Sequence, residues 1–267
     1  MTAFQPIETM PRAVMQRAWG EALVTLTGDR LARLRTEGSA KAILPDGHTG
    51  REVVFLNTSG GLTSGDHLRF QLQVEGRAVA TTQTAERAYR ASGPPARMDV
   101  RFQVGPGGWL DWLPQETILF DRSALDRRTV IDLAPGAGCL ALEAVVLGRA
   151  AMGETVRDLR FRDRREIRRD GAPLWLDPLA LDSSALAGSA TLNGARAFAS
   201  LVVTAEHPVD PLRAILDEPG VAGGVSSFAG RTVLRLMAVD GWPLRRQIVR
   251  LLHFLRQGRP LPRVWQV

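Results

Sequence analysis

Alternation between apolar and polar residues is the dominant pattern over the first two thirds of the chain. Residues 68–74 and 98–104 alternate strictly, and residues 19–35 alternate roughly by two on both sides of Gly28-Asp29. A period of two is typical of a strand with one buried face, and a Gly-Asp pair suits a tight turn. These segments therefore predict strands, with the first two joined as a hairpin.

Shorter apolar runs, separated by glycine and proline, continue toward the C-terminus. We predict further strands at residues 51–56, 78–84, 129–133, 139–147, 156–169, 173–177 and 231–239. Strands that follow one another through short turns favour a mainly β fold. No linker long enough to separate two domains is visible. We expect one domain over residues 1–267, built as a stacked or curled, β-helix-like sheet scaffold.

Two short helices are predicted near the C-terminus. Asp210 followed by Pro211 has the pattern of an N-cap and a first helical residue. Residues 243–257 carry one apolar stripe, which consists of Leu244, Ile248, Leu251, Leu252 and Leu255. A stripe at this spacing is the buried face of an amphipathic helix.

Composition adds limits to this picture. The chain has 267 residues, no apolar run long enough for a membrane span, and no apolar segment near its start that resembles a secretory signal, so we expect a cytoplasmic protein. Cys139 is the single cysteine and lies in an apolar run, which predicts a buried core residue. The histidines, His48, His67, His207 and His253, form no ligand pair, so no permanent metal site is predicted.

Arginine carries nearly all of the positive charge. The formal net charge is +6, and Lys41 is the single lysine. Residues 156–169 contain seven arginines, which we interpret as a strand with one solvated face, partly neutralised by Asp163 and Glu166. An arginine-rich surface suits an acidic protein partner, and a nucleic-acid-binding module is the alternative hypothesis.

The loop at residues 57–68 is the best candidate for a specific role. Gly60, Gly61 and Gly65 predict a shaped turn around Asp66. Ser64, Asp66 and His67 lie too close in sequence for a relay in which each side chain orients the next, so a hydrolase that uses Ser64 is only a third hypothesis. A phosphate-binding GxxxxGK loop and a GxSxG elbow are both absent from the sequence.

Four segments, in this order, resemble the urease accessory protein UreD (UreH) family. They are GGLTSGDHL, TTQTAERAYR, WLPQETILFDRS and LGRAAMGE, with further support from REIRRDGAPLWLDPL and the terminal LPRVWQV. The resemblance extends from about Thr27 to the end of the chain.

The resemblance implies a non-enzymatic scaffold for urease maturation. It implies binding to a UreF-like accessory protein, through it to a UreG-like GTPase, and to the urease apoprotein, with the chain dimeric within a hetero-oligomer. It also implies that nickel passes transiently through an internal, water-filled passage, with no cofactor bound permanently. Nucleic acid and membrane are not expected partners. Isolated carboxylates suit such transit, because a closed His/Cys cage would trap the ion.

The resemblance also implies roles for particular residues. Gly60, Gly61, Gly65 and Asp66 match the family's glycine–aspartate loop, Glu116 matches its WLPQE segment, and Arg149 and Glu154 match its GR…GE segment. His67 stands where the family usually has arginine; beside a carboxylate it could hold nickel briefly, and a surface substitution is the alternative.

For the partner surface, we predict that the C-terminal helix and tail contact the UreF-like protein. The residues concerned are Leu251, Leu255, Arg263 and Trp265.

Overall fold

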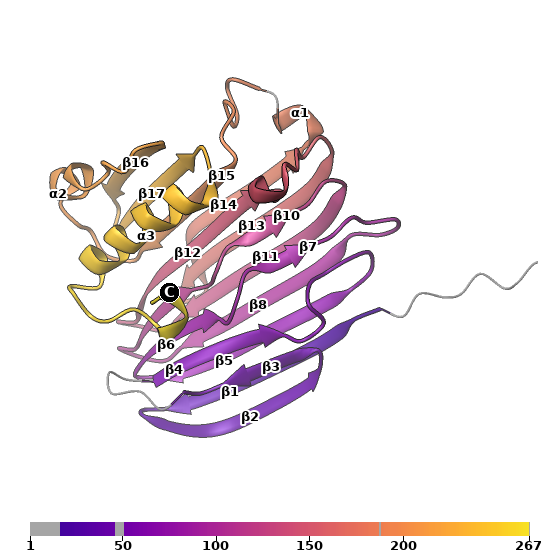
Figure 1. Cartoon of the computed structure of the whole chain (residues 1–267). Helices are drawn as coiled ribbons and strands as arrows, with labels where there is room; N and C mark the ends of the chain where they lie inside the picture. Colours follow the sequence, from indigo (N-terminus) through magenta and orange to yellow (C-terminus); the bar gives the residue numbers. More distant parts are fainter. Residues whose placement is uncertain (1–16, 46–50, 187, 267) are drawn as a thin grey trace, which may run out of the picture.

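Strands that alternate between two sheets make up most of the molecule (Figure 1). The computed structural model describes residues 17–45, 51–186 and 188–266. The segment in which we expected no secretory signal lies largely outside these ranges, at residues 1–16, and so does His48. None of the described helices is both long and apolar enough to span a membrane.

The first sheet has seven strands in the order β14-β13-β11-β8-β5-β1-β2. Their bounds are β1 (Trp19–Thr27), β2 (Arg30–Gly38), β5 (His67–Glu75), β8 (Ala96–Val104), β11 (Ser123–Leu133), β13 (Leu159–Arg169) and β14 (Ala172–Asp182). From β1 to β13 neighbouring strands are parallel, and antiparallel hairpins close both edges.

The second sheet has ten strands, eight of them in the order β16-β17-β15-β12-β9-β6-β4-β3. Their bounds are β3 (Ala40–Ile43), β4 (Arg51–Asn57), β6 (Arg77–Thr82), β9 (Trp109–Leu113), β12 (Gly138–Leu147), β15 (Ala197–Val203), β16 (Val221–Phe228) and β17 (Arg231–Ala238). The short strands β7 (Glu86–Ala88) and β10 (Thr117–Leu119) pair beside β12.

From β4 to β13 the chain passes back and forth between the sheets, so each winding adds a parallel strand to both. This arrangement confirms the predicted stacked, β-helix-like scaffold. The alternating apolar residues of 68–74 and 98–104 face the space between the sheets. There Phe55 stacks on Phe70, and Trp112 meets Phe102 edge-on. Whether residues 1–267 form one domain stays a prediction.

A second apolar core lies on the outer face of the second sheet. Helix α3 (Gly241–Leu255) lies across this face and buries the predicted leucine stripe (Figure 1). The other helical segments are α1 (Ser183–Leu186), α2 (Val209–Ala214), η1 (Ala150–Met152) and η2 (Arg263–Trp265).

Several element boundaries differ from the predictions. Helix α2 begins at Val209 after Pro208, so Asp210 lies in its first turn and makes no side-chain cap. Helix α3 begins two residues before Pro243, because the Asp240 carboxylate accepts a hydrogen bond from the Gly241 N–H, and proline is tolerated within a first helical turn. The predicted segments also omit α1 and the strands β3, β7, β9, β10, β15 and β16.

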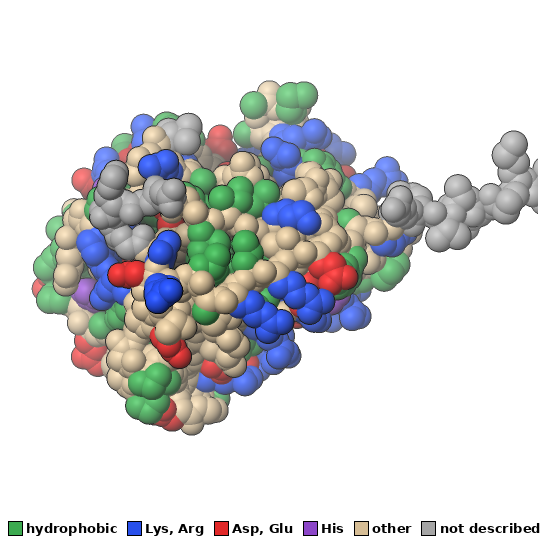
Figure 2. All heavy atoms as spheres, turned by 90° about the horizontal axis from the view of Figure 1, so that it is seen from below, with side chains coloured by type: hydrophobic (Ala, Val, Ile, Leu, Met, Phe, Trp, Pro, Cys, Tyr) green, Lys and Arg blue, Asp and Glu red, His purple; other side chains and the backbone are tan. Residues whose placement is uncertain are grey.

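Figure 2 looks at the end of the stack formed by β2 and β3. Lys and Arg side chains are spread over this face, with Asp and Glu among them and hydrophobic side chains near its centre. Leu31, Leu34 and Ile43 are exposed at this end. On the visible face the basic charge is therefore dispersed between acidic and apolar groups.

Candidate functional site

The glycine-rich loop is an anchored turn. Gly61 has φ +148°, and a Cβ there would lie 2.4 Å from the Tyr89 ring and 2.7 Å from the Arg87 carbonyl oxygen. Only glycine allows this approach. Leu62 bridges to Ala88, and the Ser64 hydroxyl accepts hydrogen bonds from the Ser92 and Gly93 N–H groups at 2.6 and 2.9 Å. Loop 57–66 is thus joined to the segment 86–93.

Asp66 serves this anchoring directly. Its side chain is buried, and its two oxygens each accept a backbone N–H at 2.8 Å, from Ala18 and from Thr63. Because both oxygens are occupied, the carboxylate fixes the turn to the start of β1. His67 is the next residue and points to the outer face of the first sheet, where its Nε2 lies 2.8 Å from Asp99 Oδ2.

The other predicted site residues have separate partners. Glu116 lies 3.6 Å from Arg245 of α3. Arg149 and Glu154 form an ion pair at 2.8 Å. Burial tends to raise the pKa of Glu154, but hydrogen bonds from Arg149 and from the Asp121 N–H outweigh it and lower that pKa. Within the described residues, no contact joins Asp66, Glu116 and Glu154. Their role in nickel passage stays a prediction.

The predicted partner residues lie mostly inside the molecule. Leu251, Leu255 and Trp265 are buried in the second core, and the Trp265 indole N–H donates to the Leu113 carbonyl at 2.9 Å. Arg263 remains exposed in η2. The exposed apolar residues of α3 are instead Trp242 and Phe254. Partner binding by the C-terminal region stays a prediction, and these two residues are the better candidates.

A charged network between the sheets is the main feature that the sequence analysis missed. Arg127 of β11 lies 2.8 Å from Glu143 of β12 and 2.8 Å from Asp163 of β13. It also donates to the Thr117 hydroxyl of β10 at 2.9 Å. Arg127 is therefore held by both sheets, and its side chain is only 4% exposed. Burial alone would lower the pKa of Arg127, but Asp163 and Glu143 raise it.

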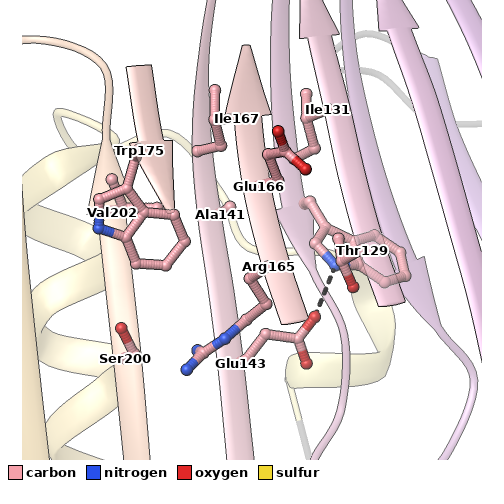
Figure 3. A pocket seen from close by; sticks show the side chains of 11 residues that line it. Thr129, Ile131, Ala141, Glu143, Arg165, Glu166, Ile167, Trp175, Ser200 and Val202 are labelled. Carbon is pink, nitrogen blue, oxygen red and sulfur yellow. Dashed lines mark hydrogen bonds between the residues drawn. The ribbon is translucent and has the colours of Figure 1, made fainter. Parts of the chain in front are cut away.

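The network continues toward the other edge of the sheets. Arg165 lies 3.3 Å from Asp163 and 2.8 Å from Asp177, and Asp177 in turn pairs with Arg235 of β17 at 2.8 Å. Figure 3 shows Glu143, Arg165 and Ser200 around a small cavity between the sheets, of about 10 Å³. That volume is at the lower limit for one water molecule.

The ends of the network meet two further cavities. Arg165, Ser200 and Arg235 line a groove of about 310 Å³ between the sheets and α1. At the opposite end, Glu86 lies beside Asn57 in a cavity of about 50 Å³ that the glycine loop also lines. Burial raises the pKa of Glu86 to about 7, although Asn57, Arg87 and the charge of Arg127 act to lower it.

Buried charges of this kind are costly unless they are paired. Burial also raises the pKa of Glu143, against the opposing charge of Arg127.

No group of three or more His, Cys, Asp and Glu residues with metal-site geometry occurs among the described residues. Cys139 is fully buried, as predicted, and burial raises the pKa of its thiol to about 12.

The sequence does contain a signal for this network. In β11 and β13, Arg127, Asp163 and Arg165 occupy the same alternating positions as Leu125, Phe161 and Ile167, which face inward. The prediction of one solvated face on β13 is thus correct for Arg160, Arg162 and Arg164 and wrong for Arg165. Because side chains alternate between the two faces of a strand, a charged residue at an inward-facing position lies on the core face.

The fold and this interior define a β scaffold whose two sheets are joined by buried ion pairs. Residues 22–266 match the family described as UreD urease accessory protein. Proteins named urease accessory protein UreD are 58% identical in Cereibacter sphaeroides, over 97% of this chain and 98% of that protein, and 56% identical in Paracoccus denitrificans, over 95% and 94%. A third, from Dinoroseobacter shibae, is 47% identical over 98% of both. The chain belongs to the UreD family of urease accessory proteins, which supports a role in urease maturation.

Proposed function

We propose that this protein is a non-enzymatic scaffold that binds the urease apoprotein together with UreF-like and UreG-like accessory proteins, and that nickel crosses its interior. The observation that carries the proposal is the buried line of charged groups between the sheets. Nickel is the cargo here, and no cofactor is held permanently. We place the protein in the cytoplasm, dimeric within a hetero-oligomer.

Physical chemistry supports transit along this line. A divalent cation inside a protein needs oxygen ligands in place of its water shell, and carboxylates and hydroxyls supply them. Glu86, Glu143 and Asp177 offer such groups in succession, between a polar cavity and an open groove. Arginines already pair with Glu143 and Asp177, so they compete with a cation for these carboxylates, which disfavours tight binding. Weak, successive sites favour release over storage.

Glu86→Gln is the sharpest test of this passage. The amide keeps the volume and the contact with Asn57 but removes the carboxylate. We expect urease activated with this variant, the accessory proteins, GTP and Ni(II) to contain several-fold less nickel, measured by mass spectrometry of the metal. Complex assembly, followed by size-exclusion chromatography, should be unchanged.

Glu37→Gln is the matched control. Glu37 is an exposed carboxylate of β2 whose visible partner is Arg35, so its loss should leave nickel loading as it is. Full nickel content in urease that was activated with the Glu86→Gln variant would contradict transit past this carboxylate. A chain that is folded but does not associate with the apoprotein or with the UreF-like protein would contradict the scaffold itself.

A further inference from the structure

A small, arginine-lined pocket lies apart from the interior network, on the outer face of the second sheet. It is formed by β4, β6 and the segment after α3, which crosses in front of β6 (Figure 1). Its volume is about 50 Å³, and its charged lining residues are Arg51, Glu52, Arg77, Arg256 and Arg259. A cavity needs roughly 10–15 Å³ on this measure to hold one water, so the pocket admits a group of a few heavy atoms.

Strand register explains how the two carboxylates of this region are arranged. Glu52 pairs with Val79, and Val79 pairs with Asp111, so the three residues form one row across β4, β6 and β9. Their neighbours Val53, Ala78 and Leu110 belong to the core between the sheets, so the row faces outward, toward the C-terminal segment.

Asp111 is fully satisfied. Its Oδ1 accepts from the Trp109 indole at 2.7 Å, and its Oδ2 accepts from Arg256 Nε at 2.9 Å. Arg256 also donates to the carbonyls of Arg259 and Pro260, which fixes the segment over the pocket.

The remaining guanidinium groups are only partly used. Among the described residues, Arg259 donates from Nε to the Arg256 carbonyl at 2.9 Å, and Arg77 lies over the Trp109 ring at 5.5 Å. Burial lowers the pKa of Arg259, and the charges of Arg77 and Arg256 lower it further, against the effect of Asp111. Glu52 is the one carboxylate among the described lining residues, against four arginines. Of these arginines, Arg51 also donates to the Asp29 carbonyl, and Arg256 is paired with Asp111.

Glu52, in contrast, lacks a hydrogen-bond donor on one of its oxygens within the described part of the chain. Its Oε1 is buried and accepts no hydrogen bond among the described residues. Burial raises the pKa of this carboxyl, although the Arg263 N–H and the charges of Arg263 and Arg256 act to lower it. The pocket therefore has spare donors on its arginines and one spare acceptor.

We propose that this pocket binds hydrogen phosphate, with its oxygens facing Arg77 and Arg259 and its hydroxyl donating to Glu52. An oxyanion would offset the excess positive charge. A protonated oxyanion would also supply the donor that Glu52 Oε1 requires, since a buried carboxylate lone pair without a donor is costly. Sulfate has the same shape and lacks that proton at neutral pH, so the pocket should discriminate against it.

The test is calorimetric titration of the full chain, in a chloride buffer without phosphate, with inorganic phosphate, sulfate and phenyl phosphate. We expect phosphate to bind and sulfate to bind at least about tenfold more weakly, which corresponds to one hydrogen bond of about 1.4 kcal/mol. Phenyl phosphate separates a free ion from a monoester: the small volume predicts that the ester binds more weakly.

Substitutions then identify the side chains that contact the anion. Glu52→Gln offers an amide donor in place of an acceptor, so it should bind sulfate more tightly and phosphate more weakly than the original chain. Arg77→Gln and Arg259→Gln should weaken both anions. Arg30→Gln, at the exposed end of β2, is the matched control and should change neither.

Absence of phosphate binding, equal binding of sulfate and phosphate, or unchanged binding by both Arg77→Gln and Arg259→Gln would overturn the proposal. If Glu52→Gln fails to fold, the two anions on the original chain and the arginine variants still decide. The measurement needs neither nickel nor urease, so this proposal and the proposed function can fail separately.

Discussion

Among single residues, Asp66 is the motif residue whose structural role is clearest. Both of its oxygens are occupied by backbone N–H groups that join the loop to the start of β1. A carboxylate in that position contributes to stability through two charge-assisted hydrogen bonds. We therefore expect its removal to affect folding before it affects nickel.

Asp66→Ala should lower the free energy of unfolding by about 1–3 kcal/mol, because two partly buried N–H groups lose their acceptor. Urea denaturation measures this. The matched control is Asp210→Ala, whose carboxylate is 93% exposed and should change stability by less than about 0.5 kcal/mol. An Asp66→Ala chain as stable as the original that still loads urease poorly would instead indicate a direct role in transit.

The raised pKa of Glu86 should make the stability of the chain depend on pH. Its pKa in the folded chain is raised to about 7 from 4.5, so between these values the folded state holds a proton that the unfolded state has lost. Stability must then fall as pH rises through this window. Glu86→Gln should remove that part of the fall, seen as a flatter plot of unfolding free energy between pH 5 and 7. Parallel plots for both proteins would contradict the raised pKa.

Among the elements, α3 was the easiest to predict and the easiest to misinterpret. Its leucine stripe gave the helix, but the same stripe is buried on the second sheet, so Leu251 and Leu255 are not available to a partner in this chain. An apolar stripe in a sequence indicates that this face of the helix is buried, but it does not identify the surface that buries it. Here the chain's own sheet does so, and the tail adds Trp265 to the same core.

Trp265→Ala should therefore act on stability, with a loss of about 3–5 kcal/mol measured by urea denaturation, because a buried ring and its hydrogen bond to Leu113 are removed. Trp242→Ala is its counterpart on the exposed face of α3. It should leave stability nearly unchanged and lower the affinity for the UreF-like protein. If Trp265→Ala instead left stability unchanged and lowered the affinity for the UreF-like protein, Trp265 would belong to the partner surface.

At the scale of the whole molecule, the mainly β scaffold was predictable because strict alternation and short turns are local signals. The strand β15 was missed because a short apolar run without alternation does not identify a strand. The pairing of Arg127 with Glu143 and Asp163 could not be predicted, since it depends on which strands become neighbours. Alternation alone, however, would have placed Arg127 on the inner face.

The burial of Trp265 against Leu113 also has a consequence for how the chain acquires its structure. The hydrogen bond between them closes a span of 152 residues, and α3, which covers the same core, lies almost as far along the chain from β9. Contacts between such distant residues form slowly, and apolar surface that waits for a partner is prone to aggregation. During synthesis the outer face of β9 and β12 therefore stays uncovered until α3 and the segment around Trp265 have been made.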